Sequence, residues 1–288
     1  MWFILSVGTA FFTATASAIM KLLIKDNDEI VIGWLRYLVC LPILVILLIA
    51  SPKPHLGSSF WKCTAILLPM ELGAFFLYLR SIKISPFSLS FPFLGFTPVF
   101  AIATSYLILG ERLTRTGIFG ILLVTVGAYI LNGDLIKQGI WEPIKNIHRE
   151  KGSFLMLIVA FIYSITSVLG KKAVALSNPH FFPLLYYPLV TVIYTAIIFP
   201  WRRPSLKKIH FGKREWGLLI LTSLVFIAGL MLHFRAISMI EAAYMISVKR
   251  LSLLFSIIYG AMLFKEKQIG YRMAGGLVMV LGTLLLAI

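Results

Sequence analysis

The chain has 288 residues, of which 59% are hydrophobic and 13% are charged, and its mean hydropathy is +0.93. A soluble core cannot bury so much apolar surface, so the composition excludes an ordinary soluble domain and favours a polytopic helical membrane protein. The net charge of +16 would suggest a nucleic-acid partner in a soluble protein, but basic loops that set topology and meet anionic lipid headgroups explain it here.

Ten apolar stretches of about 20 residues match a hydrocarbon core of roughly 30 Å. The first stretch could instead be a secretory signal, because a small-residue motif at 14–18 looks like a cleavage site. No Lys or Arg precedes its apolar run, however, which favours a membrane helix. Cys40 and Cys63 have neither a metal-ligand spacing nor the pattern of a disulfide framework. The predicted spans lie at 2–22, 30–50, 63–82, 86–109, 116–132, 153–172, 181–200, 216–237, 242–264 and 271–288.

Two connections between spans are longer than the others. Residues 201–215 are strongly basic, and residues 133–151 are polar and separate the first five spans from the last five. We therefore predict a first five-helix unit at 1–135, a linker at 136–151 and a second five-helix unit at 152–288.

Residues of the first half recur in the second half at a nearly constant offset of 150 or 155 positions. Because each half has an odd number of spans, the second copy must enter the membrane in the opposite orientation. The predicted fold class is an all-α integral membrane protein with ten transmembrane helices in two inverted five-helix repeats, with a substrate site near the midplane. The matched residues include Lys21 with Lys171, Tyr37 with Tyr187, Arg80 with Arg235, Glu111 with Glu266, Gly120 with Gly275 and Gly127 with Gly282.

The order of several short motifs resembles the drug/metabolite transporter superfamily, and specifically its EamA-like carriers of ten helices. The resemblance implies transport of small metabolites by alternating access in the cell (inner) membrane, with both termini inside the cell. The count of Lys and Arg in alternate loops favours the opposite orientation, so the two arguments disagree on topology. The motifs are YLRSI at 78–82, SP at 85–86, TPVF at 97–100, LGERL at 109–113 and FKEK at 264–267.

The span at 242–264 carries two adjacent charges, Lys249 and Arg250, roughly 10 Å in from Ala242 at about 1.5 Å per residue. A charge at the membrane centre costs about 3 kcal/mol on insertion scales and persists only beside a partner or a wet cavity. The alternative is a helix that begins later, with both charges reaching the interface. The pair is similar to the phosphate-recognising pair of plastid triose-phosphate carriers. Those carriers also use a basic residue on the fourth helix, where this chain has Leu94, so we expect a singly charged anionic group.

The span at 86–109 contains three helix-breaking residues, Pro92, Gly95 and Pro98. They predict an interrupted helix whose freed carbonyls face protein or a water-filled cavity. Leu94 and Gly95 are the copy-mates of the Lys-Arg pair, and interrupted segments in matching positions indicate a binding site. An ordinary kinked helix is the alternative.

Further candidate residues come from other spans. Glu71 could form a fixed ion pair with the Lys-Arg pair or with Arg36, or it could carry a coupling proton. His233 is the copy-mate of Tyr78, although a single histidine can also be a packing residue. A hydroxyl-rich stripe that includes Tyr163 serves either close helix packing or a cavity wall. The candidate substrate-binding residues are Lys249, Arg250, Glu71, Tyr78, His233, Tyr244, Thr97 and Tyr163.

The sequence therefore predicts a secondary active transporter of a small organic metabolite, anionic or zwitterionic, such as an amino acid or a carboxylate. We expect a monomer or homodimer in a lipid bilayer, coupled to a proton or a counter-substrate, without cofactor, metal or nucleic acid. No catalytic residue is expected, because transport needs no covalent chemistry. The alternatives are a membrane-embedded lipid-modifying enzyme, whose acid/base or metal set would have to converge near an interface, and a non-transporting scaffold, which has no reason to keep two charges in the membrane.

Overall fold

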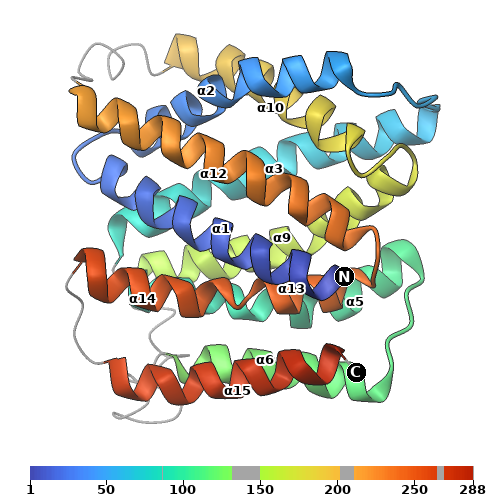
Figure 1. Cartoon of the computed structure of the whole chain (residues 1–288), viewed down its shortest axis with the longest axis vertical. Helices are drawn as coiled ribbons and strands as arrows, with labels where there is room; N and C mark the ends of the chain where they lie inside the picture. Colours follow the sequence, from blue (N-terminus) through green and yellow to red (C-terminus); the bar gives the residue numbers. More distant parts are fainter. Residues whose placement is uncertain (86, 132–149, 202–210, 265–268, 288) are drawn as a thin grey trace.

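Long apolar helices make up the computed structural model, as the composition predicts (Figure 1). The structure describes residues 1–85, 87–131, 150–201, 211–264 and 269–287, and within these ranges it contains no strand. Most of the predicted linker, the centre of the basic 201–215 loop and Glu266 lie outside the described residues. The elements are α1 (Trp2–Ile24), α2 (Glu29–Ala50), α3 (Ser58–Ile84), α4 (Phe87–Ser90), the 3-10 helix η1 (Phe91–Phe96), α5 (Thr97–Leu109), α6 (Arg115–Ile130), α9 (Lys151–Ala175), α10 (Phe181–Trp201), α12 (Lys213–Ile237), α13 (Ala242–Lys249), α14 (Ser252–Phe264) and α15 (Ile269–Ala287).

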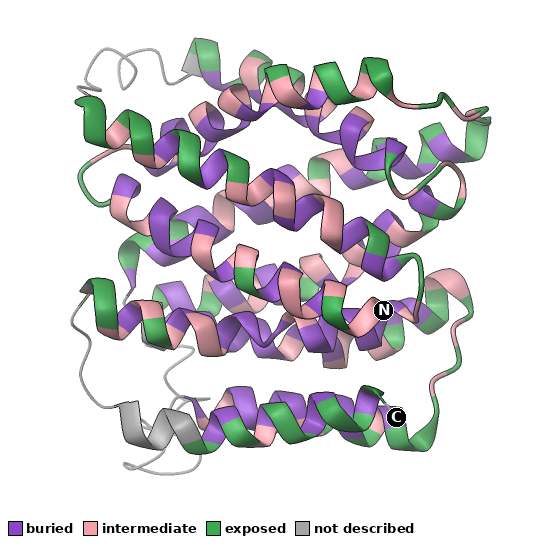
Figure 2. Cartoon of the chain, viewed as in Figure 1, coloured by how far each residue is buried: buried purple, intermediate pink, exposed green. Residues whose placement is uncertain are grey.

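Where the structure describes them, all ten predicted spans are helical, and those at 86–109 and 242–264 are interrupted. Among the described residues, eight segments are long and apolar enough to cross a membrane, whereas Arg115–Ile130 and Ala274–Ala287 are shorter apolar helices. Exposed residues lie along the outer faces of the helices (Figure 2), and many of them are large and apolar. Water would not favour such a surface, but lipid tails would. The chain is therefore a multi-pass helical membrane protein.

The closest helix pairs join one half of the chain to the other. Helix α1 packs along α12, α3 along α9, α2 along α10 and α6 along α15. Figure 1 shows α6 and α15 as an outer pair at one end of the bundle, with α13, α14, α5 and α9 beside them. The interior is therefore an interface between the two halves.

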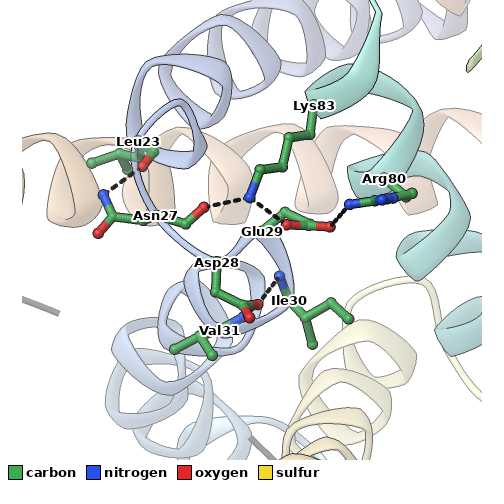
Figure 3. Close-up of polar contacts among 8 residues, drawn as sticks. All are labelled: Leu23, Asn27, Asp28, Glu29, Ile30, Val31, Arg80 and Lys83. Carbon is green, nitrogen blue, oxygen red and sulfur yellow. Dashed lines mark hydrogen bonds and ion pairs between the residues drawn. The ribbon is translucent and has the colours of Figure 1, made fainter. Parts of the chain in front are cut away.

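A polar cluster fastens the turn between α1 and α2 to the end of α3 (Figure 3). The Asp28 carboxylate caps α2 by accepting hydrogen bonds from two backbone amides of its first turn. The Glu29 carboxylate pairs with Arg80 at 3.0 Å and with Lys83 at 2.7 Å. Lys83 also donates a hydrogen bond to the Asn27 carbonyl at 2.9 Å. Helices α1 and α3 thus end on the same side of the bundle.

The start of α9 lies on that side too. The Glu150 carboxylate accepts hydrogen bonds from the Ser85 hydroxyl and from the Gly152 and Ser153 amides. Ser81 donates to the Gly152 carbonyl at 2.7 Å. Burial alone would raise the pKa of Glu150, but these hydrogen bonds outweigh it and lower the pKa below its usual value. Since α9 begins where α1 ends, the first helices of the two halves run in opposite directions.

Glycines let α6 and α15 approach each other at backbone distance. A Cβ atom added to Gly127 would lie 2.6 Å from the Gly275 carbonyl oxygen, and one added to Gly275 would lie 2.6 Å from the Gly127 oxygen. Gly120 and Gly282 repeat this contact at 3.0 Å and 2.8 Å. These are the glycines that the two sequence copies share.

We expect Gly127→Ala to lower the melting temperature of the purified protein, because the new methyl group would push α6 away from α15. Gly73→Ala in α3 is the matched control, since an added Cβ there meets no atom within 4 Å. Helix propensity alone favours alanine by about 1 kcal/mol at both positions. Equal melting temperatures for the two variants would contradict the close packing.

Candidate functional site

The predicted interruption of the span at 86–109 is confirmed in the backbone, and the span at 242–264 is interrupted as well. Helix η1 separates α4 from α5, and α13 ends at Lys249 before α14 begins at Ser252. Two carbonyls of η1 are bound by threonine hydroxyls: Thr125 donates to Gly95 at 3.1 Å, and Thr97 donates to Leu94 at 2.8 Å. The span at 86–109 is therefore interrupted by a 3-10 helix rather than bent by a simple kink. Threonine hydroxyls of the protein donate hydrogen bonds to two of the carbonyls in this helix.

A cavity of about 170 Å³ lies between the two halves. By volume it has room for on the order of ten water molecules. Side chains of α1, α2 and α3 line it from the first half, and side chains of α9, α10, α12 and α13 line it from the second. Leu94 of η1 and Ser252 of α14 also reach it, so both interrupted segments contribute to its wall.

The cavity contains four charged side chains. Among the described lining residues, Arg36, Lys249 and Arg250 are the cations and Glu71 is the only acid. Helix α13 begins at Ala242, as predicted, so the alternative of a later helix start is wrong. Arg250 is only 5% exposed. Buried positive charge thus lies on the segment Ala242–Leu263, which is long enough to cross a membrane.

Glu71 does not form the ion pair that was one of its predicted roles. In the described part of the chain, the ion pairs within 4.0 Å are Arg80–Glu29, Lys83–Glu29 and Lys171–Glu111. Glu71 lines the cavity together with Thr166 and Lys249. The acid and the cations thus share the cavity without neutralising each other in direct contact.

Four buried polar atoms in the cavity wall have no hydrogen-bond partner in the protein. A buried donor or acceptor without a partner costs about 1–3 kcal/mol, and such groups call for an explanation. A polar ligand or water that reached these atoms from the cavity would satisfy them, which favours a binding site. The atoms are Arg36 Nε, Tyr186 Oη, His233 Nδ1 and Arg250 Nε, and their side chains all line the cavity.

Most of the candidate residues come together here. Tyr78 donates a hydrogen bond to the Ser17 hydroxyl at 2.8 Å, and His233 packs edge-on against Phe234. The hydroxyl-rich stripe of α1 and α9 forms part of the wall through Thr13, Ser17, Tyr163 and Ser167. The predicted residues that line the cavity are Glu71, Tyr78, Tyr163, His233, Lys249 and Arg250.

Thr97 and Tyr244 lie away from the cavity. Thr97 is fully buried and uses its hydroxyl to bind the Leu94 carbonyl. The Tyr244 hydroxyl accepts a hydrogen bond from the Thr114 amide at 2.9 Å and rests against Gly117. Tyr244 therefore fixes α13 to the start of α6.

Sequence reasoning did not place Arg36 in the site, although it considered Arg36 as a partner for Glu71. The guanidinium lies over three aromatic rings, with centroid distances of 4.3 Å to Phe226, 4.9 Å to Phe75 and 5.1 Å to Tyr37. The signal was available, because an ionisable residue inside an apolar span is a functional candidate by default.

A second polar cluster lies at the other end of α13. The Glu111 carboxylate pairs with Lys171 and accepts a hydrogen bond from the Ala242 amide at 2.9 Å. Lys171 also donates to the Ile240 carbonyl at 2.6 Å. This cluster holds the start of α13, and hence the register of the helix that presents the Lys-Arg pair.

A helical bundle around a charged cavity between two halves is typical of membrane transporters. The model of the EamA-like transporter family matches residues 1–133 and 150–288, so the chain belongs to that family. It is therefore a membrane transporter, which disfavours the enzyme and scaffold alternatives.

Individual relatives agree with this assignment. An uncharacterized transporter in the cobO 3' region of a Sinorhizobium species is 28% identical over 142 residues, which cover 48% of this chain and 98% of that protein. The pseudopaline exporter CntI of Pseudomonas aeruginosa (strain UCBPP-PA14) is 27% identical over 192 residues, which cover 66% of this chain and 62% of the exporter. One crystal structure, at 14% identity, shares the fold with a TM-score of 0.71 over 97% of this chain and 94% of the other.

Proposed function

We propose that this protein is a secondary active transporter that moves a small anionic or zwitterionic metabolite, such as an amino acid or a carboxylate, across the cell (inner) membrane. The observation that carries the proposal is the cavity between the halves, in which three cations face one acid. Arginine offers a planar fork for carboxylate or phosphate oxygens, and Arg250 Nε has no protein partner. The substrate would bind in this cavity. The protein, as a monomer or a homodimer, would expose the cavity to each side of the membrane in turn.

Alternating access would come from rocking of the two halves, residues 1–135 and 152–288. The opposite directions of α1 and α9 support the inverted relation of these halves. A contact that recurs in both halves also supports the inverted relation. Lys21 donates to the Ser85 carbonyl at 3.4 Å, and its copy-mate Lys171 donates to the Ile240 carbonyl. The name of the Pseudomonas relative supports export as the direction of transport.

The test is transport by the purified full chain in proteoliposomes. We expect labelled glutamate or alanine to move faster than in empty vesicles and to be displaced by unlabelled anionic or zwitterionic compounds. Lysine and tetraethylammonium should neither move nor compete. Movement of the cations alone would contradict the proposal, and movement of none of these compounds would equally count against it.

Glu71 is the residue that we propose to exchange a coupling proton during the cycle, because it is the only acid among the described lining residues. In the same vesicles, an imposed pH gradient should accelerate transport by the wild type but not by Glu71→Gln. An equal response of the two proteins would exclude this role and favour exchange for a counter-substrate.

A further inference from the structure

Two cationic positions from different halves face the same cavity. Arg36 comes from α2 in the first half, and Lys249 and Arg250 come from the end of α13 in the second. Arg36 and Arg250 are each 5% exposed, and each has an Nε atom without a protein partner. One anionic group could satisfy one of these guanidinium edges, but the second would remain unpaired.

The surroundings of Arg36 fix how it can bind. Phe226, Phe75 and Tyr37 stack near the guanidinium. Cation–π contacts stabilise the charge through the plane of the group, but they do not satisfy the N–H donors at its edge. A carboxylate approaching that edge could accept two parallel hydrogen bonds.

Aromatic and polar side chains connect the two positions. Tyr78 stacks on Phe75 at 6.5 Å, and the Arg36 guanidinium lies over the same Phe75 ring. Tyr78, Tyr163 and Glu71 line the cavity together with Arg36, Lys249 and Arg250. The two cationic positions and the acid therefore belong to one continuous site, in which an elongated molecule could contact all three.

We propose that the substrate is an amino acid-like compound with two acidic groups, of which one binds Arg250 and Lys249, the other binds Arg36, and a cationic group between them faces Glu71. This inference rests on the proposed function and names its substrate class. The expectation of a singly charged anion treated the Lys-Arg pair as the only cationic position. A diacid leaves less uncompensated positive charge in the cavity than a monoacid does, and uncompensated buried charge is costly.

The test compares matched ligands on the purified full chain. The amino diacids are aspartate, glutamate, 2-aminoadipate and 2-aminopimelate, and the monoacids are alanine and norleucine. Binding is measured from the ligand-dependent rise in melting temperature. We expect the best diacid to bind at least about tenfold more tightly than either monoacid.

Arg36→Gln should remove that preference, because it should lower diacid affinity at least about tenfold more than monoacid affinity. Arg36→Lys keeps the charge but loses the planar fork, so it should retain only part of the preference for diacids. If Arg36→Gln does not fold, this reduced preference in Arg36→Lys is the result that tests the inference. The matched control is Arg112→Gln, an exposed arginine, which should behave like the wild type.

Two outcomes would overturn the inference and spare the proposed function: equal binding of diacids and monoacids by the wild type, or a preference that survives in both Arg36 variants. If neither series binds, the inference and the anionic substrate beneath it both fail.

Discussion

Arg250→Ala is expected to weaken substrate binding and transport by on the order of 30-fold or more. Truncating one partner of a buried, hydrogen-bonded charge pair costs about 2–5 kcal/mol, and each 1.4 kcal/mol is about tenfold in affinity. Arg250 lines the cavity with an unpartnered Nε atom, so its hydrogen-bonding capacity is available to a ligand. The measurement is the initial rate of substrate uptake in proteoliposomes.

Two controls separate binding from folding. Arg250→Lys keeps the charge without the fork and should fall between the wild type and the alanine variant. Arg235→Ala removes an exposed arginine at the end of α12 and should leave transport unchanged.

The melting temperature of the ligand-free protein adds a second readout. Removing an unpaired charge from a buried position relieves a desolvation cost, so ligand-free Arg250→Ala should melt no lower than the wild type. Unchanged transport by this variant would refute its role in binding, and a lower melting temperature would make Arg250 a structural residue.

Hydropathy and helix-breaking residues were sufficient to predict the helices. Pro92, Gly95 and Pro98 predicted the interruption that became η1, because proline cannot donate the helical hydrogen bond. The sequence also indicated Glu71, Lys249 and Arg250 as candidate substrate-binding residues, since unpaired charge is tolerated in a membrane only beside a partner or a wet space.

Which residues line the site was harder to predict from the sequence, because it depends on the direction in which each side chain points in the packed bundle. Tyr244 and Lys249 lie on the same short helix, yet Tyr244 binds Thr114 and only Lys249 reaches the cavity. Thr97 was a candidate from its motif, but its hydroxyl satisfies a carbonyl that the adjacent break frees. Arg36 could be recognised as a charge inside an apolar span, but its contacts with Phe75 of α3 and Phe226 of α12 depend on helix packing that no local pattern reports.

Glu111→Ala is expected to destabilise the protein and to reduce transport, although Glu111 does not line the cavity. The Glu111 and Lys171 side chains are 11% and 19% exposed, so the pair is largely removed from solvent. Breaking a buried pair by removing one partner costs about 3 kcal/mol, because the other charge is left uncompensated. The substitution also leaves the Ala242 amide, at the start of α13, without its acceptor.

The contribution of the pair itself can be isolated with a double-mutant cycle of Glu111→Ala and Lys171→Met. If the two residues act together, the double variant should be less destabilised than the sum of the single variants. Arg112→Ala, at the exposed neighbouring position, is the control and should match the wild type.

The effect on transport follows from geometry. Helix α13 is short, with the Glu111 contact at its first residue and Lys249 at its last, so a shift at one end displaces the other. Glu111→Ala should therefore raise the substrate concentration needed for half-maximal uptake, even at temperatures where the variant remains folded. If the variant melts at a lower temperature but transports with wild-type affinity, Glu111 has only a structural role. The contact at the start of α13 would then not determine the position of the Lys-Arg pair.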